Sequence, residues 1–92
     1  MRVISQDGAI DIPYNEYVIY TTKPEHSLKY HIVCDIENSR GNYRLLAEYS
    51  SKEKATKAME LLREVYIHTV SPDYDVIRAV FQFPQDDEIT LW

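Results

Sequence analysis

One segment with helical periodicity, set among segments that alternate, restricts the fold of this chain most. Between residues 50 and 68, apolar side chains recur at spacings of three and four, which predicts an amphipathic helix. Its apolar stripe consists of Ala55, Ala58, Met59, Leu62, Val65 and Tyr66. Ser50 followed by Glu53 fits a capping box at its start, and Ser71-Pro72 stops it. Such a helix must bury its stripe against other elements, here strands.

The segments around this helix have the period of two that is typical of strands with one buried face. Asp7-Gly8 lies between two short apolar runs and predicts a tight hairpin. Further strands are expected over residues 17–22, 29–37, 43–49 and 76–83, the middle two forming a second hairpin. The order hairpin, strand, hairpin, helix, strand predicts an α+β fold with one largely antiparallel sheet of five or six strands, flat or curled.

Chain length and charge suggest one domain with an acidic end. A chain of 92 residues is expected to form a single domain, residues 1–92. The net charge is −5, and from Asp73 onward there are five acidic residues and one basic residue. We therefore expect residues 84–92, which contain the run "QDDE", to form an acidic, solvated C-terminal tail.

The composition also argues against several partners and compartments. An acidic chain is a poor ligand for phosphate backbones, so no direct binding to DNA or RNA is expected. No apolar run approaches the length needed to cross a bilayer. The N-terminal segment "MRVISQDG" does not resemble a signal peptide, and the single cysteine cannot form an internal disulfide. We expect a cytoplasmic protein.

Catalytic and metal-binding patterns are weak in this sequence. Two glycines, Gly8 and Gly41, cannot form a phosphate-binding loop of the known types. The three histidines lack metal-ligand spacing, and Cys34 falls on the buried face of its predicted strand, where a free cysteine is usually inert. We expect a protein that is not an enzyme, with no catalytic residues, no metal and no cofactor.

A single helix is too narrow for the predicted sheet. A helix is about 10 Å wide and strands lie about 5 Å apart, so one helix covers two to three strands. Alternation places Val33, Leu46 and Val80 on the less apolar side of the sheet. We expect a second copy of the chain to cover that side, which makes the protein a homodimer or a larger homo-oligomer.

Four arginines are not used by ion pairs of the predicted helix: Arg40, Arg44, Arg63 and Arg78. By parity, Arg44 and Arg78 point to the less apolar side of the sheet. Guanidinium groups bind phosphate oxygens, and Tyr43 and Phe81 can supply aromatic surfaces for a base. The predicted ligand-binding residues are thus Arg78, Phe81, Arg44 and Tyr43.

A simpler use of these arginines requires no ligand. Arg44 and Arg78 can pair with acidic side chains on neighbouring strands. The available acids are Asp35, Glu37 and Glu48.

Three stretches carry a resemblance to a known group of proteins: "MRVISQDGAIDIPY", "LAEYSSKEKATKAMELLREVY" and "VFQFPQDDEI". They resemble short, mostly uncharacterised proteins of prophages and mobile elements in Gram-positive bacteria. The chain is also similar to phage anti-defence proteins that inhibit Thoeris immunity. That resemblance implies an oligomeric protein in the bacterial host cytoplasm that sequesters a cyclic nucleotide immune signal without cleaving it. It implies pocket roles for Arg78, Phe81 and Arg44.

A different binding function stays open. The acidic end "QDDEITLW" and the many tyrosines can dock on a basic groove of a bacterial defence protein, with charge steering the encounter. In that case the chain is an anti-CRISPR-like inhibitor that blocks its target directly. A phage accessory protein with neither role is the third possibility.

Overall fold

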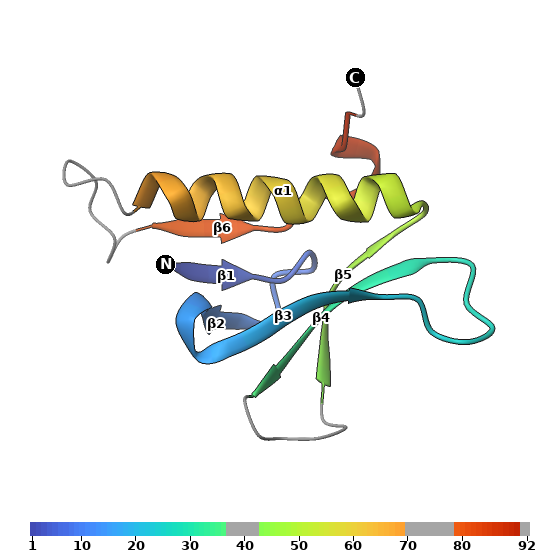
Figure 1. Cartoon of the computed structure of the whole chain (residues 1–92), viewed down its shortest axis with the longest axis horizontal. Helices are drawn as coiled ribbons and strands as arrows, with labels where there is room; N and C mark the ends of the chain where they lie inside the picture. The colour runs from blue at the N-terminus through green and yellow to red at the C-terminus, as the bar shows by residue number, and fades with distance from the viewer. Residues whose placement is uncertain (37–42, 70–78, 91–92) are drawn as a thin grey trace.

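The structure is a computed structural model, and it describes residues 1–36, 43–69 and 79–90. Its elements follow the predicted order and confirm the α+β class (Figure 1). They are β1 (Arg2–Ile4), β2 (Asp11–Pro13), η1 (Tyr14–Glu16), β3 (Tyr17–Thr22), β4 (Tyr30–Ile36), β5 (Tyr43–Tyr49), α1 (Lys52–Thr69), β6 (Val80–Gln82) and η3 (Asp86–Glu88). The predicted turn near Gly41 and the start of the last predicted strand lie outside the described residues.

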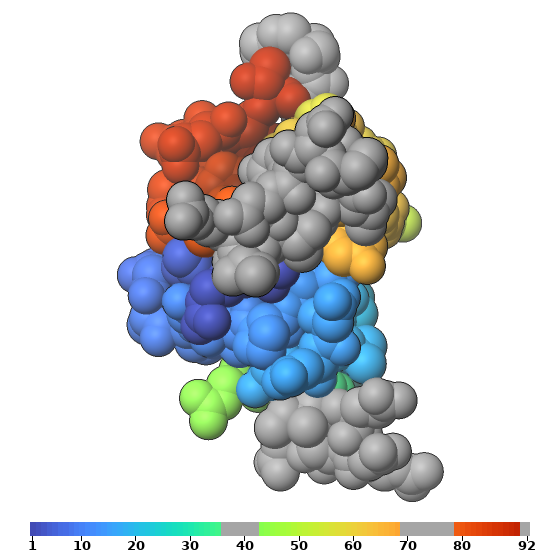
Figure 2. Space-filling model, turned by 90° about the vertical axis from the view of Figure 1, so that its left-hand side faces the viewer, coloured from blue at the N-terminus to red at the C-terminus, as the bar shows by residue number. Residues whose placement is uncertain are grey.

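The six strands form two sheets of three rather than the single sheet expected from the sequence. One sheet has the order β2-β1-β6 and the other has the order β3-β4-β5. The first strand pairs antiparallel with β2 and parallel with β6, so the first and last strands of the chain lie side by side (Figures 1 and 2). Val80 therefore belongs to a different sheet from Val33 and Leu46, and the common face predicted for these three does not form.

A β-bulge in β5 changes which side chains share a face. Ile32 lies opposite Ala47, whereas the next residue, Val33, lies opposite Leu45. Leu46 is thus the extra residue of the bulge, and strict alternation ends there.

Because of this bulge, Arg44 lies on a different side of the sheet from the one predicted. Arg44 lies opposite Cys34, and directly opposed residues of a sheet point to the same side. Arg44 is therefore on the side of Cys34, not on the side of Val33 as alternation predicted. Leu46 is buried with the core, at 1% exposure.

The outer edge of β5 is occupied by one glutamine from the β1–β2 turn. The backbone N–H of Gln6 donates to the Leu46 carbonyl (2.7 Å), and its side-chain oxygen accepts from the Glu48 N–H (3.1 Å). Its side-chain nitrogen donates to the carbonyls of Glu48 (3.3 Å) and Pro84 (3.0 Å). Gln6 thus satisfies edge groups of β5 much as another strand would, and it joins the two sheets.

The turn that presents Gln6 is held by its own side chains. Gly8 has φ +78°, a conformation that suits glycine. The Asp7 carboxylate accepts hydrogen bonds from the Ser5 hydroxyl (2.6 Å) and the Ala9 N–H (3.0 Å), and the same hydroxyl accepts from the Ile10 N–H (2.9 Å). Ser5 is consequently buried with its hydroxyl satisfied. The predicted Asp7-Gly8 hairpin is confirmed.

The acidic C-terminal segment is attached to the body through Pro84, Asp86 and Ile89, so residues 84–90 are not a free tail. The other residues of the segment, Gln85, Asp87, Glu88 and Thr90, are exposed, as predicted for a solvated end. Burial raises the pKa of the Tyr49 hydroxyl, which donates to the Pro84 carbonyl at 2.7 Å. Ile89, at 8% exposure, belongs to the hydrophobic core. Ile89 directly follows the acidic residues 86–88, and its burial holds this segment on the core.

Asp86 attaches this segment to the start of α1. Its carboxylate accepts from the Ser50 N–H (2.8 Å), the Ser50 hydroxyl (3.0 Å) and the Lys54 ammonium (3.3 Å). The hydrogen bond from the Ser50 N–H is the main reason that the pKa of Asp86 is lowered. Helix capping falls to Ser51, one residue later than predicted, because its hydroxyl accepts from the Lys54 N–H (3.2 Å).

We expect Gln6→Ala to destabilise the protein by about 2 kcal/mol, because it removes three side-chain hydrogen bonds and leaves β5 backbone groups unpaired. Chemical denaturation measures this loss. Gln82→Ala is the matched control, since Gln82 is exposed and makes one 3.3 Å bond to the Ser5 carbonyl; a cost below about 0.5 kcal/mol is expected. Equal losses of stability in both variants would show that the contact of Gln6 with the edge of β5 contributes no more than the single hydrogen bond of Gln82.

Acid should weaken the Asp86 attachment. Its folded-state pKa is lowered, so its contribution is complete above the unfolded-state pKa of about 3.9 and is lost as the pH falls below that value. Asp86→Asn should be less stable than wild type by about 1 kcal/mol at pH 7, and the difference should shrink below about pH 4. Thermal melts from pH 7 to pH 2 test this. Asp87→Asn is the neighbouring control, and we expect it to have the same stability as wild type over this pH range. A difference independent of pH would contradict the role of the Asp86 charge.

Candidate functional site

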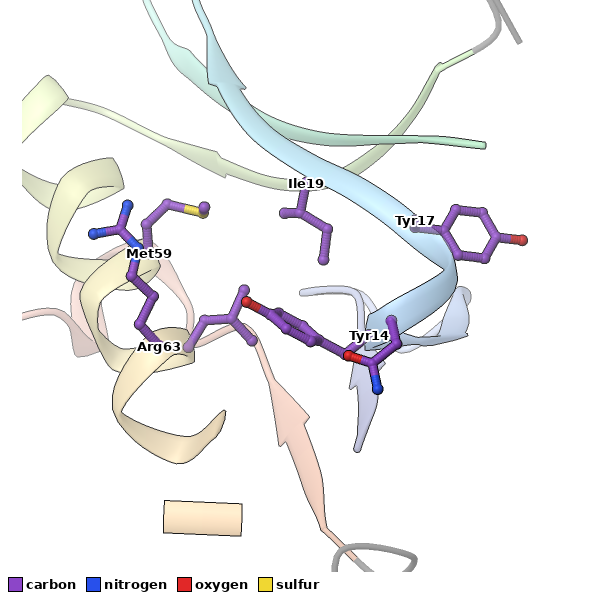
Figure 3. A pocket seen from close by; sticks show the side chains of 7 residues that line it. Tyr14, Tyr17, Ile19, Met59 and Arg63 are labelled. Carbon is purple, nitrogen blue, oxygen red and sulfur yellow. The ribbon is translucent and has the colours of Figure 1, made fainter. Parts of the chain in front are cut away.

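An open cleft lies where the helix stops covering the β3-β4-β5 sheet. The helix packs on β4 and β5, which leaves the inner side of β3 accessible beside it. This α1–β3 cleft has a volume of about 330 Å³ (Figure 3). It is lined by residues of η1, β3 and α1: Tyr14, Asn15, Tyr17, Ile19, Met59, Leu62 and Arg63.

The interior of the α1–β3 cleft is apolar and aromatic. Ile19 points into it from β3, Met59 lies on the helix side, and the Tyr14 ring reaches across from η1 toward the helix (Figure 3). Tyr14 is positioned by Tyr66, whose ring centroid lies 4.5 Å away with the planes tilted by 30°. The Tyr17 ring points away from the cleft (Figure 3). Tyr14 is thus the aromatic side chain available to a bound molecule.

A positive charge stands at the rim of the cleft. Arg63 is an exposed residue of α1, and its side chain runs along the helix toward Met59 (Figure 3). It forms no ion pair with any other residue that the structure describes. A guanidinium is charged at all physiological pH values. Arg63 can therefore bind an anion at the mouth of the cleft.

The described members of the predicted ligand set do not share a site. Phe81 is 7% exposed and packs edge-on against Phe83 in the core, with ring centroids 5.1 Å apart. Tyr43 is 52% exposed, and Arg44, the next residue along β5, points to the opposite side of the strand. Arg78 lies outside the described residues. The predicted pairing of an aromatic ring with two arginines is therefore not visible in the described structure.

The simpler use of Arg44 is not observed either. Asp35 accepts a hydrogen bond from the Tyr20 hydroxyl (3.1 Å). Glu48 binds Lys29 and His31, each at 3.1 Å, and the hydrogen bond from Lys29 is the main cause of its lowered pKa. Among the described residues, Arg44 pairs with neither acid; Glu37 falls outside them.

Outside the cleft, the described chain has one free thiol. Cys34 is buried, as predicted, and burial raises the pKa of its thiol. Within residues 1–36, 43–69 and 79–90, no three His, Cys, Asp or Glu side chains gather in a way that could hold a metal ion. None of the helices in those ranges combines the length and apolarity required to cross a lipid bilayer.

No protein-family model, curated protein or solved structure matches this chain. The sequence pointed to Arg63 as an unpaired guanidinium but not to Tyr14 or Asn15. Their place in the cleft depends on where the helix axis crosses the sheet. No local pattern in the sequence encodes that crossing.

Proposed function

We propose that this protein is a binding protein that sequesters a small nucleotide in the α1–β3 cleft without converting it. The observation that supports this proposal is the guanidinium of Arg63, which forms no ion pair with the described residues, at the rim of a hollow with an aromatic and apolar lining. A nucleotide presents the complementary groups, a flat ring and a phosphate, at a short separation.

Each part of such a ligand has a partner in the cleft. The base packs against Tyr14 with Ile19 and Met59 on the other sides, which removes apolar surface from water. The phosphate binds the planar fork of Arg63. The amide of Asn15, which can donate and accept, is the polar group available to the edge of the base.

The volume of the cleft limits how much of the ligand is buried. Ligand sites in proteins usually measure about 300 to 1,000 Å³, and this cleft, at about 330 Å³, is near the lower limit. One nucleoside unit is therefore held inside, and the rest of a larger molecule projects outward. Cyclic ADP-ribose-type signals and cyclic oligonucleotides belong to this ligand class. The resemblance of the sequence to phage anti-defence proteins implies that the ligand is such an immune signal, and we propose that the protein sequesters it in a bacterial host.

The alternative function, direct blocking of a defence protein by the acidic end, has less support. The carboxylate of Asp86 is used by Ser50 and Lys54, and that of Glu88 accepts from the Gln85 N–H at 2.8 Å. Asp87 makes no hydrogen bond or ion pair with the described residues. Two of the three acidic groups therefore serve the fold of this chain and are less available to a basic partner.

Calorimetry with matched ligands tests the proposal. The ligands are AMP, adenosine, ADP-ribose, cyclic ADP-ribose isomers and cyclic di- and trinucleotides. We expect at least one phosphorylated ligand to bind with a Kd below about 100 μM, which corresponds to about −5.5 kcal/mol. Arg63→Gln should weaken that ligand at least about tenfold, or 1.4 kcal/mol, and should leave the weaker binding of adenosine unchanged because adenosine has no phosphate.

Arg44→Gln is the matched control, because Arg44 is also exposed and unpaired among the described residues but does not line the cleft. It should bind the phosphorylated ligand like wild type. The absence of binding by every ligand at about 100 μM, or a loss caused by Arg44→Gln and not by Arg63→Gln, would reject the cleft as the site.

A further inference from the structure

One edge of β3 has no partner among the described residues. This strand, Tyr17–Thr22, ends the order β3-β4-β5 and pairs with β4 along its other edge. No backbone hydrogen bond from another segment of the described chain reaches the free edge. In an antiparallel pair, every second residue directs its N–H and C=O groups away from its partner. The free edge therefore presents a row of unpaired donors and acceptors, the surface to which a further strand adds.

The other edges of the two sheets are protected. Gln6 occupies the edge of β5. The outer strands of the other sheet, β2 and β6, have three residues each. The first contains Asp11 and ends at Pro13, and Pro84 follows closely after the second. Short length, charge and proline are common means by which proteins prevent a strand from adding to an edge.

The free edge of β3 has none of these protections. Its six residues, "YVIYTT", contain no charged residue and no proline, and all six pair with β4 in an unbroken register. Tyrosine, valine, isoleucine and threonine are residue types that favour strands. An uncharged and regular edge of this length is suited to bind another strand through main-chain hydrogen bonds.

Opposite charges stand at the two ends of β3. Glu16 directly precedes the strand and Lys23 directly follows it, and both residues are exposed. Neither side chain forms an ion pair with the described residues. The strand between them holds the two charges about 20 Å apart, so they cannot pair within one chain.

These charges make the free edge complementary to a second copy of itself. We propose that β3 pairs antiparallel with β3 of a second copy of this chain, about a two-fold axis perpendicular to the sheet. Antiparallel pairing brings Glu16 of each copy beside Lys23 of the other, so each end of the contact gains an ion pair. Parallel pairing would instead bring the two Glu16 carboxylates together and the two Lys23 ammonium groups together. Isologous contacts of this kind are the commonest in homodimers.

The dimer contains one continuous sheet of the order β5-β4-β3-β3-β4-β5. Each helix packs on β4 and β5 of its own copy, so neither helix lies over the new contact at the axis. A strand edge buries less than the about 800 Å² per partner of a standard complex, so the dimer should be reversible and depend on concentration. Main-chain hydrogen bonds supply its affinity, and the proposal does not depend on nucleotide binding in the α1–β3 cleft.

Charge reversal at the two ends of β3 tests the pairing, with sedimentation velocity of the full chain from about 10 μM to about 1 mM. Wild type should shift from monomer to dimer over this range. Glu16→Lys and Lys23→Glu each place like charges at both ends of the contact, so each should weaken dimerisation about tenfold. Glu60→Lys is the matched control, because it changes the net charge as Glu16→Lys does but lies on the exposed side of α1, and it should dimerise like wild type.

Rescue distinguishes the pairing from a change in the fold of one copy. The double variant Glu16→Lys/Lys23→Glu should dimerise like wild type, and so should an equal mixture of the two single variants. Both restore opposite charges at each end of an antiparallel contact. Single variants that dimerise like wild type, or a double variant as weak as either single variant, would overturn the proposed pairing.

Hydrogen exchange locates the contact in the wild-type protein. The β3 amides that point away from β4 should exchange several-fold more slowly at about 1 mM than at about 10 μM, whereas the β3 amides bonded to β4 should not change. A protein that stays monomeric at about 1 mM, or a dimer in which the outward β3 amides exchange as fast as in the monomer, would overturn the proposal.

Discussion

The contact between Gln6 and the edge of β5 is the interaction on which the rest of this structure depends. A three-stranded sheet is stable only if it buries a hydrophobic face, and here two such sheets share one core. Gln6 supplies four hydrogen bonds to Leu46, Glu48 and Pro84, which fix one sheet against the other and bring in the C-terminal segment. That segment in turn holds the start of α1 through Asp86. The turn, the bulged strand and the chain end are thus linked through Gln6, and Asp86 extends this link to the helix.

The surface left over by this arrangement explains where binding is proposed. One helix covers β4 and β5, so β3 keeps an open inner side, which forms the α1–β3 cleft. The cleft follows from the small size of the chain. It presents an aromatic ring beside a guanidinium that forms no ion pair with the described residues, and this chemistry favours a nucleotide as its occupant.

Local signals in the sequence predicted the elements but not how they pair. The Asp7-Gly8 turn, the alternating strands and the apolar stripe of the helix depend on neighbouring residues, and all three were recovered. The parallel pairing of β1 with β6 joins residues nearly eighty positions apart. The periodicity of the sequence therefore does not indicate this pairing. No sequence pattern indicates the bulge at Leu46 either. Because of this bulge, Arg44 lies on the side of the sheet opposite to the one predicted. Phe81 alternates with Ala79 and Phe83 and lies in the core with them, so its position does not support the ligand-binding role predicted for it. Tyr14 lies in the cleft because of the packing of η1, which the sequence does not indicate.

Native-state hydrogen exchange of individual amides tests most directly whether Gln6 joins the two sheets. The Gln6 and Glu48 N–H groups both lie in this contact. If the two sheets form one cooperative unit, these amides should exchange as slowly as those in the centre of β4, through global unfolding. Exchange of both amides many-fold faster than in β4, in an otherwise folded protein, would show that the contact opens on its own and would contradict this account.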